Sequence, residues 1–342
     1  MNHVMVAMPL IVALVILALA FDFINGLHDA ANSIATVVST KLLSPVQAVL
    51  FAAFFNFAAY WFFGLKVAET VGKGIIDKEL VTPHVIFGAL VGAMAWNVIT
   101  WLRGIPSSSS HALVGGLVGS GLAHAGPGAI VWSGISKTTS FIVLAPLLGM
   151  MMAMTLMLIT SWIFMKATAN SAEGIFKKLH LVSAAAYSLG HGSNDAQKTM
   201  GIISVLLYSQ GLLGGKFHVP EWVVIACYIA MGLGTLSGGW KIIETMGSRI
   251  TKLSHHQGFC ASLGGSLLLF GASAFGIPVS TTHTITGSIM GVGAARRTSA
   301  VRWGVAQRLV MAWIVTIPAA ALVGAAFYWV AVGIDKLSTS AF

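Results

Sequence analysis

Charged side chains are scarce in this chain. Only 8% of its 342 residues are Asp, Glu, Lys or Arg, whereas a soluble domain usually contains about 25%. Hydrophobic residues make up 56%, and the mean hydropathy is +0.86. This composition excludes an ordinary water-soluble fold. It predicts an all-α polytopic membrane protein, because helices satisfy their backbone hydrogen bonds internally within lipid.

Cysteine is almost absent too. The two cysteines, Cys227 and Cys260, stand in apolar runs without other metal-ligand side chains beside them. This usage indicates neither a disulfide framework nor a thiolate metal site.

Acidic residues number ten against nineteen basic ones, for a net charge of +9. Ten of the basic residues fall in three short segments, as the positive-inside rule produces for cytoplasmic loops. We therefore expect a lipid bilayer as the partner of this chain, and no nucleic acid. The three segments contain Lys166, Lys177 and Lys178; Lys241, Arg249 and Lys252; and Arg296, Arg297, Arg302 and Arg308.

Long apolar runs occur along the whole chain. A helix of about 20 residues spans the hydrocarbon of a bilayer, and we count about ten such segments, among them residues 4–23, 46–65, 82–102, 138–164 and 307–330. No lysine or arginine precedes Pro9, so the first run is expected to stay as a membrane helix. With the basic loops inside, the acid-balanced loop 66–81 and both termini fall outside the plasma (inner) membrane of a bacterium.

Two motifs occur twice. The sequence Gly-Ile-Pro-Ser-Ser-Ser-Ser-His at 104–111 matches Gly-Ile-Pro-Val-Ser-Thr-Thr-His at 276–283, with five identical positions. A weaker match sets residues 26–30 over 192–196. Because loop 66–81 is expected outside and its counterpart 241–252 inside, the copies form an inverted-topology repeat. We predict a first repeat at 1–165, a cytoplasmic linker at 166–180 and a second repeat at 181–342.

Polar and ionisable residues gather in apolar surroundings in both copies of the repeat. Such groups cost several kcal/mol in a membrane and indicate function, although linking helices by hydrogen bonds is the alternative. Gly26 and the Gly190–Gly192 stretch are expected to break the helices there, which frees carbonyl groups for a cation. The first copy contains Asp22, Asn25, His28, Asp29 and Asn32, and the second contains His191, Asn194, Asp195, Gln197 and Lys198.

Hydroxyl side chains follow Pro106 and Pro278. Each proline suits the first turn of a helix, so each motif is expected to open a half-helix. A helix start presents free N–H groups and about half a positive charge, which together form an anion site. Simple helix capping is the alternative interpretation. The hydroxyls are Ser107, Ser108, Ser109, Ser110, Ser280, Thr281 and Thr282.

These four motifs, in this order, resemble the inorganic phosphate transporter (PiT) family over nearly the whole chain. The resemblance implies two inverted repeats with broken helices and re-entrant or half-helix hairpins, usually in a homodimer. It implies a secondary transporter, not an enzyme, that imports inorganic phosphate by symport with a proton or sodium and needs no other cofactor.

The resemblance also implies roles for individual residues. It gives phosphate contacts to Ser108, Ser109, Ser110, Ser280, Thr281 and Thr282, and contacts to both cation and phosphate to Asp29, Asn32, Asn194 and Asp195. The same four residues are candidates for holding sodium. We add Ser107 and Gln197 to the phosphate-binding set, and Asp22 and Lys198 to the coupling set.

The position that matches Asn32 is Lys198. A tethered ammonium there could replace one mobile cation and favour proton or mixed coupling, or it could simply neutralise an acid. A sulfate permease is the closest alternative function, but only hydrogen phosphate has a proton to donate to a carboxylate. An anion channel would not need the buried acids, and a hydrolase would not need a duplicated site.

Overall fold

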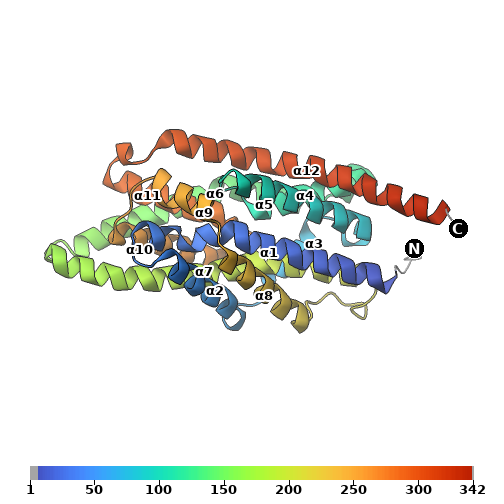
Figure 1. Cartoon of the computed structure of the whole chain (residues 1–342), viewed down its shortest axis with the longest axis horizontal. Helices are drawn as coiled ribbons and strands as arrows, with labels where there is room; N and C mark the ends of the chain where they lie inside the picture. Colours follow the sequence, from blue (N-terminus) through green and yellow to red (C-terminus); the bar gives the residue numbers. More distant parts are fainter. Residues whose placement is uncertain (1–6, 341–342) are drawn as a thin grey trace.

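The computed structural model describes residues 7–340, without the side chains of residues 78 and 338–340. This part of the chain contains helices and no β-strand, which confirms the all-α prediction (Figure 1). The first six helices are α1 (Met8–Ser39), α2 (Pro45–Ala58), α3 (Lys66–Gly74), α4 (Pro83–Leu102), α5 (Ser109–Ala125) and α6 (Trp132–Ile163). They are followed by α7 (Ala169–Ser209), α8 (Glu221–Ser237), α9 (Trp240–Glu244, continued by a π-helical turn, Thr245–Arg249), α10 (His255–Ala274), α11 (Thr281–Arg296) and α12 (Trp303–Ser340).

Four of the described helices, α1, α4, α6 and α12, are long and apolar enough to cross a membrane. Two further spans result if each bent pair counts as one: α2 with α3, bent by 85°, and α8 with α9, bent by 69°. Fewer helices meet this criterion of length and composition than the ten or so apolar segments counted in the sequence. Helices α5 and α11 have only 17 and 16 residues, fewer than the roughly 20 that a crossing needs. These bent and short helices confirm the expected broken-helix fold.

The six helices of each half exchange contacts in a matching pattern. Helix α1 packs against α8 while α7 packs against α2, and α5 packs against α12 while α11 packs against α6. Each half thus buries its helices against the other half. Helix α7 begins at Ala169, so most of the stretch 166–180 is helical.

Two lysines anchor matching helix ends. Lys241 Nζ donates to the carbonyl of Leu102, the last residue of α4, at 3.1 Å, and Lys66 Nζ donates to that of Ala274, the last residue of α10, at 3.0 Å. The backbone then turns at Gly104 and Gly276, whose φ angles of +64° and +65° favour glycine. This duplicated contact was not predicted, because both lysines read as ordinary loop charges.

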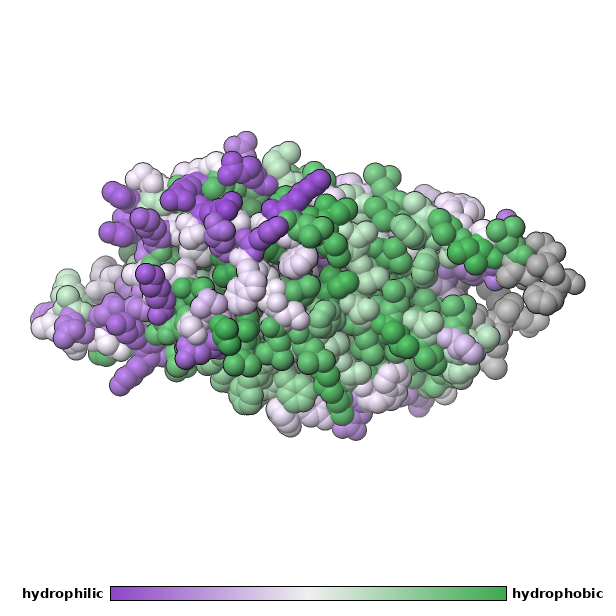
Figure 2. All heavy atoms as spheres, in the orientation of Figure 1, coloured by the Kyte–Doolittle hydropathy of each residue, from purple (hydrophilic) through white to green (hydrophobic). Residues whose placement is uncertain are grey.

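The surface is divided by polarity. Figure 2 shows a broad apolar region over the middle of the molecule and hydrophilic atoms gathered at the left end. Phe54, Trp162 and Leu322 are 65%, 80% and 75% exposed, as suits side chains that face lipid. In Figure 1 the start of α1 and the end of α12 lie together at the right end, and the α6–α7 and α11–α12 connections lie at the left.

Candidate functional site

Helices α1 and α7 carry the buried acids and run unbroken past them. The prediction that Gly26 and the Gly190–Gly192 stretch break these helices was wrong. A Cβ on Gly26 would lie 2.3 Å from the carbonyl oxygen of Met231 in α8, and one on Gly192 would lie 2.4 Å from that of Asn56 in α2. These glycines therefore permit close helix packing, as small residues do in membrane proteins.

Helices α5 and α11 begin directly after hydroxyl N-caps. Ser108 Oγ accepts a bond from the His111 N–H, and Ser280 Oγ accepts one from the His283 N–H, both at 3.2 Å. Pro106 and Pro278 were expected in the first helical turn, but each lies two residues before the N-cap. The N-cap position suits serine better, because its hydroxyl satisfies a free N–H group.

The first hydroxyl of each half-helix bonds to an acid of its own half. Ser109 Oγ donates to Asp29 Oδ2 at 2.6 Å, and Thr281 Oγ1 donates to Asp195 Oδ2 at 2.8 Å. These residues are the matched positions of the two motifs. The structure therefore contains one carboxylate–hydroxyl pair in each half.

Bonds between the halves join these pairs into one cluster. Asn32 Nδ2 donates to Thr281 Oγ1 at 3.1 Å and to Thr282 Oγ1 at 2.9 Å. At the matched position, Lys198 Nζ donates to Ser110 Oγ at 2.5 Å and also to Asp195 Oδ1. We call this group the central cluster. All of its members are buried, and it consists of Asp29, Asn32, Ser109, Ser110, Asp195, Lys198, Thr281 and Thr282.

A histidine stands beside each acid of the central cluster. His28 Nδ1 lies 2.7 Å from Asp29 Oδ1, and His191 Nε2 lies 3.2 Å from Asp195 Oδ2. Asp29, His191 and Asp195 each offer one ligand atom, and these three atoms lie within 4.8 Å of one another. They are close enough to bind one cation jointly. From the sequence, both histidines were expected only as polar neighbours of the acids. Their ring orientation depends on packing, which no motif signals.

Ser107 and Gln197, both assigned to phosphate binding, bond to protein groups outside the central cluster. Ser107 Oγ donates to Thr100 Oγ1 at 2.9 Å. Gln197 Oε1 accepts from the N–H groups of Val67 and Ala68 at 3.0 and 3.3 Å, and its amide nitrogen donates to Ser193. Gln197 therefore caps the start of α3, and its side chain is occupied by that role.

The coupling candidates Asp22 and Asn194 also bond elsewhere. Thr199 Oγ1 donates to Asp22 Oδ1 at 2.9 Å. Asn194 Nδ2 lies 3.5 Å from both Ser273 Oγ and the carbonyl oxygen of Ile277. Among the described residues, neither side chain bonds to a hydroxyl of the central cluster.

Several buried oxygens in this region accept no hydrogen bond from the described residues. They include Asp22 Oδ2 and the side-chain oxygens of Asn25, Asn32 and Asn194. Buried polar atoms are normally bonded, and carboxylate and amide oxygens are ligands that hard cations prefer. These oxygens suit a cation such as sodium, and Asn32 and Asn194 belong to the predicted sodium set.

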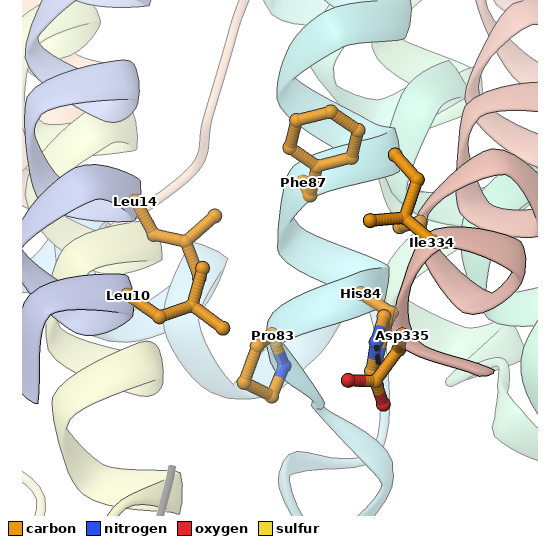
Figure 3. Close-up of a pocket in the computed structure, with 8 residues that line it drawn as sticks. Leu10, Leu14, Pro83, His84, Phe87, Ile334 and Asp335 are labelled. Atoms are coloured by element: carbon orange, nitrogen blue, oxygen red, sulfur yellow. Dashed lines mark ion pairs between the residues drawn. The ribbon is translucent and has the colours of Figure 1, made fainter. Parts of the chain in front are cut away.

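A separate apolar pocket lies between α1, α4 and α12 (Figure 3). Leu10, Leu14, Pro83 and Phe87 line it, and His84 Nε2 lies 3.6 Å from Asp335 Oδ2 at its edge. No residue of the central cluster contributes to this pocket. Its lining offers little to an oxyanion, so the central cluster remains the candidate site.

Known proteins resemble this chain over most of its length. A family model described as "Phosphate transporter family" matches residues 25–324. The chain is 62% identical to a "Probable low-affinity inorganic phosphate transporter" of Rhizobium meliloti (strain 1021), over 95% of this chain and 97% of that one. It is 44% identical to a protein of the same description from Bacillus subtilis (strain 168), over 94% and 97%.

A solved structure is similar as well. It is described as "The sodium-dependent phosphate transporter" and matches with a TM-score of 0.85 at 26% identity, over 94% of this chain and 99% of that one.

Proposed function

Because this chain belongs to the phosphate transporter family, we propose that it imports inorganic phosphate as a secondary transporter, by symport with a proton or sodium. The family consists of transporters and not of enzymes. The sodium dependence printed for the similar solved structure supports a coupling cation in this chain.

One observation carries the proposal: two half-helix starts and two buried acids meet in the central cluster. The Ser109–Asp29 and Thr281–Asp195 bonds place a hydroxyl beside each carboxylate. Helix starts attract anions through their free N–H groups and dipoles. Ser108, Ser109, Ser110, Ser280, Thr281 and Thr282 would contact the phosphate oxygens, and Asp29 or Asp195 would accept a hydrogen bond from the hydroxyl of hydrogen phosphate.

The same acids explain why a cation would move with phosphate. A dianion beside two buried carboxylates is strongly repelled unless positive charge enters with it, because charges in a low dielectric interact strongly. Each ligand therefore raises the affinity for the other, and this coupling is reciprocal. Asp29, Asn32, Asn194 and Asp195 supply oxygens for the cation, and Asp22 adds a further acid nearby.

The arrangement in the membrane belongs to the same proposal. We place repeat 1–165 and repeat 181–342 in inverted orientation, with the segment 166–180 and the other basic segments in the cytoplasm. Both termini would then lie outside a bacterial plasma membrane. The bacterial relatives support this location, and the family resemblance supports a homodimer.

Uptake of labelled phosphate into liposomes that contain the purified protein tests the function. We expect phosphate to accumulate above its external concentration when a pH or sodium gradient is imposed, and accumulation to stop when an ionophore removes the gradient. Sulfate in excess is expected to compete weakly. Equal competition by sulfate would indicate a sulfate permease, and equilibration without accumulation would indicate a channel.

A further inference from the structure

We infer that the Lys198 ammonium is a built-in coupling cation, which occupies in the second half the place that a mobile cation takes in the first. The inference rests on the proposed symport and concerns how many cations the same site must recruit. It follows from the surroundings of Lys198, from the contrast with Asn32, and from the balance of buried charge.

The surroundings of Lys198 resemble those of a bound cation. Its Nζ donates to three oxygens, which are Asp195 Oδ1, Ser110 Oγ and the carbonyl oxygen of Val279. These ligands come from α7, from the start of α5 and from the segment before α11. Lys198 as a whole residue is 3% exposed, so water does not replace these contacts.

The matched position in the first half has no such charge. Asn32 donates to Thr281 and Thr282, and its own Oδ1 accepts no hydrogen bond from the described residues. An amide cannot neutralise the neighbouring Asp29. The first half therefore offers a carboxylate and an unpaired oxygen, which together suit a mobile cation.

Buried acids outnumber buried lysines and arginines. Asp22, Asp29 and Asp195 are buried, whereas Lys198 is the only buried lysine or arginine in the described part of the chain. The histidines beside Asp29 and Asp195 carry a charge only when they are protonated. Lys198 balances Asp195 permanently, because it cannot leave the site. Each transport cycle would therefore recruit one mobile cation fewer than a site with asparagine at both matched positions.

The test compares Lys198→Asn with Lys198→Met in purified protein. Binding of inorganic phosphate is measured as sodium chloride replaces N-methylglucamine chloride at constant ionic strength, which keeps screening constant. In Lys198→Asn we expect phosphate affinity without sodium to fall about 100-fold, as when one partner of a buried charge pair is removed. Addition of sodium is then expected to raise the phosphate affinity of this variant again, by at least about tenfold.

The methionine variant is the matched control, because it lacks both the charge and the oxygen ligand. We expect it to lose affinity like Lys198→Asn but to show no recovery with sodium. The inference would be overturned if the two variants behaved alike. This includes the cases in which sodium restores phosphate affinity in both, restores it in neither, or both keep wild-type affinity. Thermal unfolding of each variant with and without phosphate identifies a variant that does not fold.

The wild-type protein supplies a second measurement that needs no variant. We expect phosphate affinity to depend on sodium with a logarithmic slope of at most one. A slope of two would show two mobile sodium ions and would overturn the inference, although the proposed symport would stand. Failure of the wild-type protein to bind phosphate at any sodium concentration or pH would instead contradict the proposed function.

Discussion

The two halves of the central cluster share their hydroxyl–acid pairs but differ at the position of Asn32 and Lys198. The hydroxyls proposed to bind phosphate are duplicated: Ser109 donates to Asp29 in the first half, and Thr281 donates to Asp195 in the second. The counter-charge is not duplicated, because Asn32 stands where the second half has Lys198. A symmetric oxyanion needs matching hydroxyls from both sides, whereas coupling cations need only a sufficient total charge. Charge is therefore where the halves of such a site can diverge.

The largest difference between the halves is expected from removing each acid. Asp195→Asn leaves the Lys198 ammonium buried without its acid, which should cost about 3–5 kcal/mol of unfolding free energy. Asp29→Asn loses hydrogen bonds to a carboxylate but leaves no lysine unpaired, so about 1–3 kcal/mol is expected. Denaturant unfolding in detergent measures both, and phosphate uptake should fall strongly in each variant.

A double variant checks the origin of this difference. Asp195→Asn combined with Lys198→Met should regain much of the lost stability, because no unpaired charge remains. Equal losses of stability in the two single variants would contradict the asymmetric picture.

The hydroxyl pairs should behave alike if the anion side is truly duplicated. Ser109→Ala and Thr281→Ala each remove a bond to a carboxylate, worth about 1.5–3 kcal/mol. We expect phosphate affinity to fall at least about tenfold in each. Ser109→Thr and Thr281→Ser retain the hydroxyl and serve as controls with near-normal affinity. A loss confined to one half would show that only that half contacts phosphate.

Close packing at the matched glycines should cost stability in both halves. Gly26→Ala and Gly192→Ala would place a Cβ less than 2.5 Å from a backbone oxygen of a neighbouring helix, and overpacking of this kind costs about 1–3 kcal/mol. Gly232→Ala is the control, because the nearest neighbour of its Cβ would be the Ala53 backbone oxygen, at an ordinary contact distance of 3.8 Å. Thermal unfolding in detergent measures the effect. If Gly26→Ala and Gly192→Ala left stability unchanged or raised it, these glycines would be needed for helix breaks and not for close packing.

The smallest effect is expected at Gln197, which has no equivalent role in the first half. Gln197→Ala should lower stability by about 1 kcal/mol through the lost cap on α3, and the KM for phosphate uptake should stay unchanged. Gln47→Ala removes a similar cap from the exposed start of α2 and provides a control far from the site. A raised KM in Gln197→Ala alone would return this residue to the phosphate-binding set.

Local features of the sequence were sufficient for the class of the protein and for most of the site. Hydropathy predicts a helical membrane protein, since lipid admits few other folds. The duplicated motifs identify the acids and hydroxyls, because residues that recur at a constant offset occupy equivalent places. Six of the residues identified in this way lie in the central cluster: Asp29, Asp195, Ser109, Ser110, Thr281 and Thr282.

Only the tertiary structure decided which side chains meet. Asn32 and Thr282 are separated by 250 positions, and Gln197 reaches α3 instead of the hydroxyls. Gly26 and Gly192 pack against neighbouring helices instead of ending their own. The sequence suggests that a glycine breaks its helix, but its actual effect depends on which neighbouring helix packs against it. The position of the opposite helix follows from the packing of the whole molecule, which local sequence patterns do not contain.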